Sequence, residues 1–480
     1  MSEKIRFYHN PTGSPTGVRD CFFLLLHGPL LQTLSLLLLR RWVRLHPWEP
    51  WIEILTVALP LLFHMTLGAG VLSLTLAILL VSCFLALVVL NSRQGLLHDD
   101  FSNTDDESQG GLVVSLFRGY NVLLVSLAIL AVDFDIFPRS FCKTELHGFG
   151  LMDIGTGTTV VASALSSHLS RCDSTHTRGP LPLPRSFSGL QVLSLGVMRL
   201  LALKLTGYHE HPSEHGTHWN FFFTLFAVWQ LATASEKLVR EIGWIFVLLL
   251  VAVLAAIYER LLLNGLGSQI LHHSRPNFPT VEGNYSLTVF VDWFVWHNRE
   301  GFAAVWSHSL IFFLAAATSR VCCLCPLRGD VGNSAASTRI ICGNWNRLKR
   351  LASAACATML LFAYCQSLGL TPSRRQGNIA YILLVIGMSV SVLAALQLSL
   401  FVCQSVSRQN LIAHRRLFLL ERLANRALPT FILGNMFTGA VNLSFRVAGQ
   451  DTRLCNQRVA FIILTSYCGL ICVTAVLMGL

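Results

Sequence analysis

Residues 129–157 read ILAVDFDIFPRSFCKTELHGFGLMDIGTG, and they interrupt an otherwise apolar chain with acids, bases and a proline. The apolar residues at its start predict a membrane-spanning helix whose last turn carries Asp133 and Asp135. We expect Pro138 to end that helix, because proline cannot continue the backbone hydrogen-bond ladder. Asp153 lies in the next apolar segment, although an ionisable group inside a span is costly unless it faces protein or water. The stretch is therefore interpreted as a polar hairpin at a functional site.

The composition of the whole chain indicates a membrane protein. The chain has 480 residues, of which 53% are hydrophobic and only 13% are charged, and a single soluble core does not bury that much apolar surface. The net charge of +11 is explained by arginines in loops that stay in the cytosol, so we expect a lipid bilayer and no nucleic acid as partner.

Apolar runs of about 18 to 22 residues, the length that crosses about 30 Å of hydrocarbon, recur along the chain. They predict an all-α, polytopic membrane protein of about 13 transmembrane helices in one domain, residues 1–480. The expected spans are residues 21–39, 51–68, 71–90, 119–137, 148–167, 187–205, 219–235, 241–258, 301–319, 350–370, 378–402, 430–448 and 459–480. Lys and Arg gather in the loops that are cytosolic if the N-terminus is luminal. This orientation gives a cytosolic C-terminus and turns the hairpin toward the lumen.

A second polar stretch, GYHEHPSEHGTHWNFFFT at residues 207–224, contains four histidines and two glutamates. Such a set suits zinc or iron. Pro212 and Gly216, however, break the helix that would bring ligands together at i and i+4. We favour a polar active-site loop without a metal, in which histidine carries protons near neutral pH.

Further charged residues lie in or beside the predicted spans. Arg199 falls inside a span and needs a partner, for which Asp153 or Asp133 is the natural candidate; the alternative is an ion pair that only orients helices. The patches NREG (298–301) and SRRQGN (373–378) suit phosphate, because a guanidinium makes bidentate bonds to it. Alternatively, the two patches only cap helices on the luminal side.

These stretches taken together closely resemble the phosphatidylinositol-glycan class W family. Its members are endoplasmic-reticulum acyltransferases that acylate the inositol of glucosaminyl-phosphatidylinositol during GPI-anchor synthesis. The resemblance is dense over residues 129–224 and extends in patches to residues 298–301, 373–378 and 435–443. It implies a multi-pass enzyme of the endoplasmic-reticulum membrane that transfers a fatty acyl group, typically palmitoyl from palmitoyl-CoA, to the inositol 2-hydroxyl. Acyl-CoA is then a co-substrate, and no cofactor is expected.

The resemblance also implies residue roles. Asp133 in AVDF and Lys143 in KTE match the catalytic pair of the family pattern. Asp135 stands where the family commonly has a neutral residue, so we expect it to be dispensable. Residues expected to bind substrate or support the site are Arg139, Glu145, Asp153, Arg199, Glu210, His211, His218, Asn220, Arg299, Arg374 and Arg375.

Other interpretations remain open at this level. His211 or His218 is the rival to Asp133 as the base, and Asp133 and Lys143 alternatively form only a salt bridge over the hairpin. Intramembrane charges and glycine-interrupted helices are also typical of a lipid transporter or flippase, although such folds commonly show repeats and none is found. A non-catalytic scaffold of the same pathway is the third class.

Overall fold

The computed structural model describes residues 9–10, 17–41, 48–92, 106–170, 186–206, 212–275, 287–324, 343–405, 419–447, 452 and 455–478. Most of these residues are helical, because an apolar chain in lipid must satisfy its backbone hydrogen bonds within each segment. The helices are α2 (Gly17–Arg41), α3 (Glu49–Glu53), α4 (Leu59–Met65), α5 (Leu72–Ser92), α6 (Asp106–Ala131), α7 (Leu151–Leu165), α8 (Ser186–Thr206), α9 (Pro212–His215), α10 (Phe221–Ile242), α11 (Trp244–Leu261), α12 (Gly267–His272), α13 (Leu287–His297), α14 (Arg299–Val321), α15 (Asn344–Ser367), α16 (Ile379–Ser405), α17 (Leu419–Asn425), α18 (Ala427–Val447) and α19 (Gln457–Leu477).

Each predicted span coincides with helical structure in the described residues. Eight helical segments there are long and apolar enough to cross a membrane, and two shorter apolar ones lie at Pro50–Met65 and Leu151–Leu165. The all-α polytopic membrane class is therefore confirmed. The count of thirteen spans and the orientation of the termini stay predictions.

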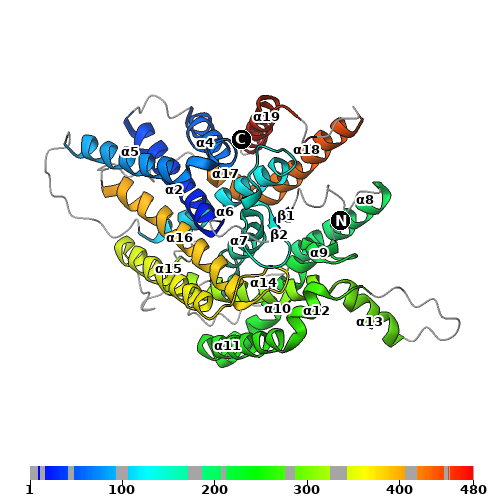
Figure 1. Cartoon of the computed structure of the whole chain (residues 1–480). Helices are drawn as coiled ribbons and strands as arrows, with labels where there is room; N and C mark the ends of the chain where they lie inside the picture. The colour runs from blue at the N-terminus through cyan, green and yellow to red at the C-terminus, as the bar shows by residue number, and fades with distance from the viewer. Residues whose placement is uncertain are drawn as a thin grey trace.

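One helix sits at the centre of the bundle. α16 packs against α2, α6, α7, α14 and α15 (Figure 1). Its apolar window is 72% buried, whereas those of α5 and α11 are only 11% and 17% buried. Apolar side chains left outside the protein core are stable only in lipid, so α5 and α11 present the lipid-facing surface.

The structure corrects the predicted end of α6. The helix stops at Ala131, so Asp133 and Asp135 lie in the turns after it and not in its last turn. The backbone N–H groups of Asp133 and Phe134 bond three residues back, to Leu130 and Ala131, which tightens the chain before Pro138 is reached. The proline is not what ends this helix.

A second correction concerns the span predicted at residues 241–258. The helical path continues beyond α11 through a π turn, η7 (Leu262–Leu266), into α12. Gly265 in that turn has φ 114°, which kinks the path. The extension carries Ile270, His273 and Arg275 to the polar centre described below.

The N-terminal segment lies against the hairpin. Strand β1 (His9–Asn10) pairs in parallel with β2 (Lys143–Thr144), and His9 is opposite Lys143 (Figure 1). His9–Asn10 and the 129–157 hairpin are therefore on the same side of the helix bundle.

Candidate active site

Asp153, which is fully buried in the first turn of α7, holds the hairpin in shape. Its Oδ2 accepts hydrogen bonds from Thr144 N, Thr144 Oγ1 and Gly150 N, at 3.0, 3.0 and 3.1 Å. Gly150 is required here, because a Cβ at this position would lie 2.0 Å from the carbonyl oxygen of Cys142. Asp153 thereby fixes β2, the strand that carries Lys143.

The other carboxylate oxygen of Asp153 binds Arg374, not Arg199. Arg374 Nε lies 2.8 Å from Asp153 Oδ1, and both side chains are buried. Arg199 is exposed on α8. The prediction of a charged partner for Asp153 is thus correct, but the predicted partner, Arg199, was wrong. The reason is that α8 turns Arg199 outward, while the loop before α16 brings Arg374 to α7.

The loop that carries Arg374 is hydrogen-bonded to the hairpin. Pro372 O accepts a hydrogen bond from Gly148 N at 2.8 Å, and Ser373 Oγ donates to Leu146 O at 2.6 Å. Asn378 closes the loop on itself, because its Oδ1 accepts from Ser373 N at 3.0 Å. Residues 373–378 and the hairpin therefore form one polar assembly.

Lys143 pairs with Glu214 on α9, at 2.7 Å between Nζ and Oε2. Arg374 Nη1 donates to the backbone oxygen of Glu214 at 3.1 Å. Burial by itself raises the pKa of Glu214, but Lys143 and Arg374 together hold that pKa well below its usual range. Glu214 is consequently an anion that fixes the Lys143 ammonium, and the 207–224 stretch forms a second wall of the site.

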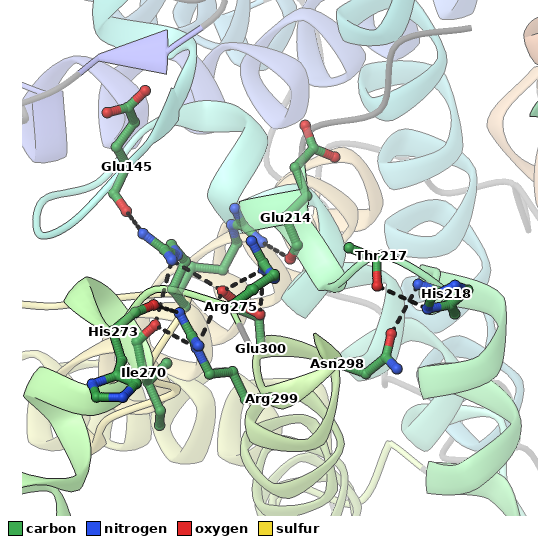
Figure 2. Close-up of polar contacts among 12 residues, drawn as sticks. Glu145, Glu214, Thr217, His218, Ile270, His273, Arg275, Asn298, Arg299 and Glu300 are labelled. Atoms are coloured by element: carbon green, nitrogen blue, oxygen red, sulfur yellow. Dashed lines mark hydrogen bonds and ion pairs between the residues drawn. The ribbon is translucent and has the colours of Figure 1, made fainter. Parts of the chain in front are cut away.

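A cluster of arginines surrounds Glu300, the buried third residue of NREG (Figure 2). Arg275 Nη2 donates to both of its carboxylate oxygens at 2.9 Å, and Arg375 Nη2 donates to Oε1 at 3.1 Å. Arg299 Nε lies 3.7 Å from the same oxygen. Arg375 also donates to the backbone oxygen of Glu145 at 2.9 Å, which joins this cluster to the hairpin. The carboxylate of Glu145 points away from the arginines.

Asp133 occupies a different environment from Asp135, two residues on. Asp133 is only 7% exposed, and its Oδ2 accepts a hydrogen bond from Asn442 Nδ2 of α18 at 2.8 Å, whereas Asp135 is exposed. A hydrogen bond from an amide fixes the orientation of a carboxylate. Asp133 is thus a buried and oriented carboxylate.

His218 lies on the far side of the site from Glu145 (Figure 2). Its Nδ1 is 2.8 Å from Thr217 Oγ1, and its ring is 5.4 Å from that of Trp293 between centroids. Burial, Lys204 and His297 lower the pKa of His218 from its ordinary value. The imidazole is therefore neutral near pH 7 and retains the capacity to accept a proton.

The remaining predicted residues separate into three groups. Asn220 is a helix cap: its Oδ1 accepts from Phe222 N and Phe223 N, and its Nδ2 donates to Gly196 O at 2.8 Å. Arg139 is exposed at the turn after Pro138. Glu210 and His211 lie outside the described residues.

Three contributors were missed by sequence reasoning. Glu300 is in the quoted NREG patch and Glu214 in the histidine-rich stretch, so both were visible but unassigned. Arg275 lies in HHSRP at residues 272–276, where no motif marks it. Its role depends on the kinked continuation of α11, which the sequence pattern did not predict.

The whole chain resembles one protein family. A family model described as GWT1 matches residues 1–478. The chain belongs to the GWT1 family. A GWT1-family relative, the GPI-anchored wall transfer protein 1 of Saccharomyces cerevisiae, is 28% identical over 374 residues, which cover 76% of this chain and 72% of that protein.

Two further relatives extend the comparison. An uncharacterized protein of Arabidopsis thaliana is 30% identical over 363 residues, 74% of this chain and 70% of that protein. The glucosaminyl-phosphatidylinositol-acyltransferase PIGW of Bos taurus is 44% identical over 131 residues, 27% of this chain and 26% of that protein. The resemblance identified from the polar motifs is confirmed by the GWT1-family match.

Proposed function

We propose that the protein is an acyltransferase of GPI-anchor biosynthesis that acylates glucosaminyl-phosphatidylinositol. The observation that carries this proposal is the GWT1-family match over residues 1–478, together with a relative named as the acyltransferase for that glycolipid. The donor is acyl-CoA, with palmitoyl as the acyl group, and the acceptor is the inositol 2-hydroxyl. Acyl-CoA is a co-substrate in this proposal, which includes no cofactor.

The proposed chemistry is a base-assisted attack on a thioester. Asp133 accepts the proton of the inositol hydroxyl while the hydroxyl oxygen attacks the acyl carbonyl carbon. Lys143 stabilises the resulting tetrahedral oxyanion. Collapse of this intermediate breaks the C–S bond, and the CoA thiolate takes the proton from Asp133. The burial of Asp133 and its bond to Asn442 support the base role.

Lys143 is suited to stabilising the oxyanion, because its position is fixed while its ammonium group stays partly accessible. Its side chain is 23% exposed, and an ammonium has three N–H donors, of which the ion pair with Glu214 occupies only a part. Asp153 fixes the adjacent Thr144 from both backbone and side chain. This arrangement presents a pre-oriented cation beside the hairpin.

The proposed setting is the endoplasmic-reticulum membrane, with one domain of thirteen spans, a luminal N-terminus and a cytosolic C-terminus. The pairing of β1 with β2 supports a common side for the N-terminal segment and the hairpin. The distribution of Lys and Arg among the loops places the N-terminal segment and the hairpin on the luminal side in this proposal, so acylation takes place at the luminal face.

The proposal is tested with Asp133→Ala and Lys143→Ala in a microsomal acylation assay, using labelled palmitoyl-CoA and glucosaminyl-phosphatidylinositol. Each variant is expected to lose turnover by about a hundredfold or more with normal expression. Asp135→Ala is the matched control, because this acid is exposed in the same turn, and it should retain activity. Near-normal turnover in the Asp133 and Lys143 variants would refute the assignment.

Purified protein separates the enzyme from a transporter or a scaffold. Release of free CoA together with acylated glycolipid is the expected result for the enzyme. Movement of glycolipid between leaflets without product formation would instead establish transport, and silence in both assays would favour a scaffold.

A further inference from the structure

The group Arg275, Arg299 and Arg375 carries more positive charge than its shared carboxylate neutralises. All three guanidiniums are ion-paired with Glu300, whose side chain is fully buried. The other acceptors of Arg299 and Arg375 are neutral carbonyl oxygens: Ile270 O lies 3.1 Å from Arg299 Nε, and Arg299 Nη2 also donates to His273 O (Figure 2). Guanidinium groups stay charged in proteins. Three charged guanidiniums thus share one carboxylate.

Arg299 and Arg375 each have one donor without an acceptor among the described residues. Arg299 Nη1 and Arg375 Nε are both buried without a hydrogen bond, in residues that are 7% and 8% exposed. Buried donors without acceptors are rare in native structures, and each requires an explanation such as an ion or ligand. The two atoms belong to arginines that are both ion-paired with Glu300 Oε1.

The electrostatic environment of Arg375 agrees with this interpretation. Burial lowers its pKa, Glu300 raises it, and Arg374 and Arg275 lower it again, so that the pKa lies below its ordinary value. The surroundings therefore oppose the positive charge of this arginine. A bound anion would relieve that opposition, because it supplies negative charge and hydrogen-bond acceptors together.

We propose that Arg275, Arg299 and Arg375 form a binding site for a substrate phosphate group. A phosphodiester presents several acceptor oxygens to guanidinium forks, which suits a cluster of converging arginines better than a single carboxylate does. Arg275 is the most exposed of the three arginines, with a side chain that is 23% exposed, whereas Glu300 is fully buried. Arg375 bonds the carbonyl of Glu145, two residues after Lys143, so the bound phosphate is held next to the proposed catalytic hairpin.

This inference rests on the proposed function, which offers two sources of phosphate: the phosphodiester of the glycolipid and the phosphates of CoA. The two are distinguished kinetically. Arg275→Gln, at the partly exposed position, is expected to raise KM about tenfold for the substrate that supplies the phosphate and to change KM for the other less than twofold. Arg260→Gln, an exposed arginine at the end of α11, is the control and should leave both constants unchanged.

A binding measurement keeps the site testable apart from turnover. Inorganic phosphate should raise the apparent melting temperature of the purified wild-type protein more than sodium chloride of equal ionic strength does. Arg275→Gln should abolish the difference, and Arg260→Gln should preserve it. If wild-type protein yields no acylated glycolipid, the proposed function is refuted. The phosphate-dependent shift in melting temperature still tests the phosphate site in that case. An active Arg275→Gln enzyme with both KM values and the phosphate shift unchanged would overturn the phosphate site alone.

Discussion

Asn442 on α18 donates a hydrogen bond of 2.8 Å to Asp133, which lies just beyond the end of α6 and 309 residues earlier in the chain. This contact is the structural basis for a positioning role of α18 in the proposed reaction. The amide has no charge of its own, so it orients the carboxylate without neutralising it.

Replacing Asn442 with Leu should lower turnover by about ten- to a hundredfold, because a hydrogen bond to a charged group contributes about 1.5–3 kcal/mol. Acylation by purified protein at matched expression measures this.

Asn435→Leu is the control for Asn442→Leu, because Asn435 bonds only to Phe431 O of its own helix among the described contacts, at 2.8 Å. The control should keep wild-type turnover. Equal losses in both variants would show that α18 has been disturbed as a whole, and the positioning role would be rejected.

Asp153→Asn should destabilise the protein strongly. The variant removes the carboxylate that pairs with the buried guanidinium of Arg374, and breaking a buried ion pair typically costs about 3–5 kcal/mol. A lower apparent melting temperature in detergent is the measurement, and Asp135→Asn, at an exposed position, should show no shift. A wild-type melting temperature for Asp153→Asn would contradict the anchoring role.

The ion pair between Lys143 and Glu214 should stabilise the protein across the neutral range. Lys143 and Arg374 outweigh burial and hold the pKa of Glu214 below its unfolded value, so the stabilisation is complete above about pH 4.3 and is lost as the pH falls further. The melting-temperature difference between wild type and Glu214→Gln should therefore stay constant from pH 8 to pH 5. A difference that shrinks within this range would point to a histidine instead.

Gly377→Ala should displace the loop that carries Arg374 and Arg375. Gly377 has φ 62°, and an added Cβ would lie 2.5 Å from Ser307 Cβ on α14. The left-handed backbone alone costs a non-glycine residue about 1–2 kcal/mol. Both stability and acylation should fall, whereas Gly469→Ala, in α19 with open space around it, should be tolerated. Wild-type stability and acylation in Gly377→Ala would contradict this prediction and show that the loop accommodates the added methyl group.

The fold was predictable to a useful degree because hydrophobic run length is a local property. Every run expected to span the membrane contains helical structure among the described residues, and the polar hairpin was evident from the cost of placing acids beside lipid. The end of α6 and the continuation of α11 were not predicted. Both depend on backbone turns, at residues 132–137 and at Gly265, that hydropathy does not register.

The sequence by itself determined the membrane class, the family and the four polar stretches that carry the charged residues. Only the tertiary structure decided how those charges pair: Asp153 with Arg374, 221 residues away, and Glu300 with an arginine that no motif marks. The physical reason is that a buried charge takes the partner that helix packing brings within a few ångströms. Arg199 and Arg374 are equally cationic in the sequence, but only Arg374 is carried by a loop docked on the hairpin.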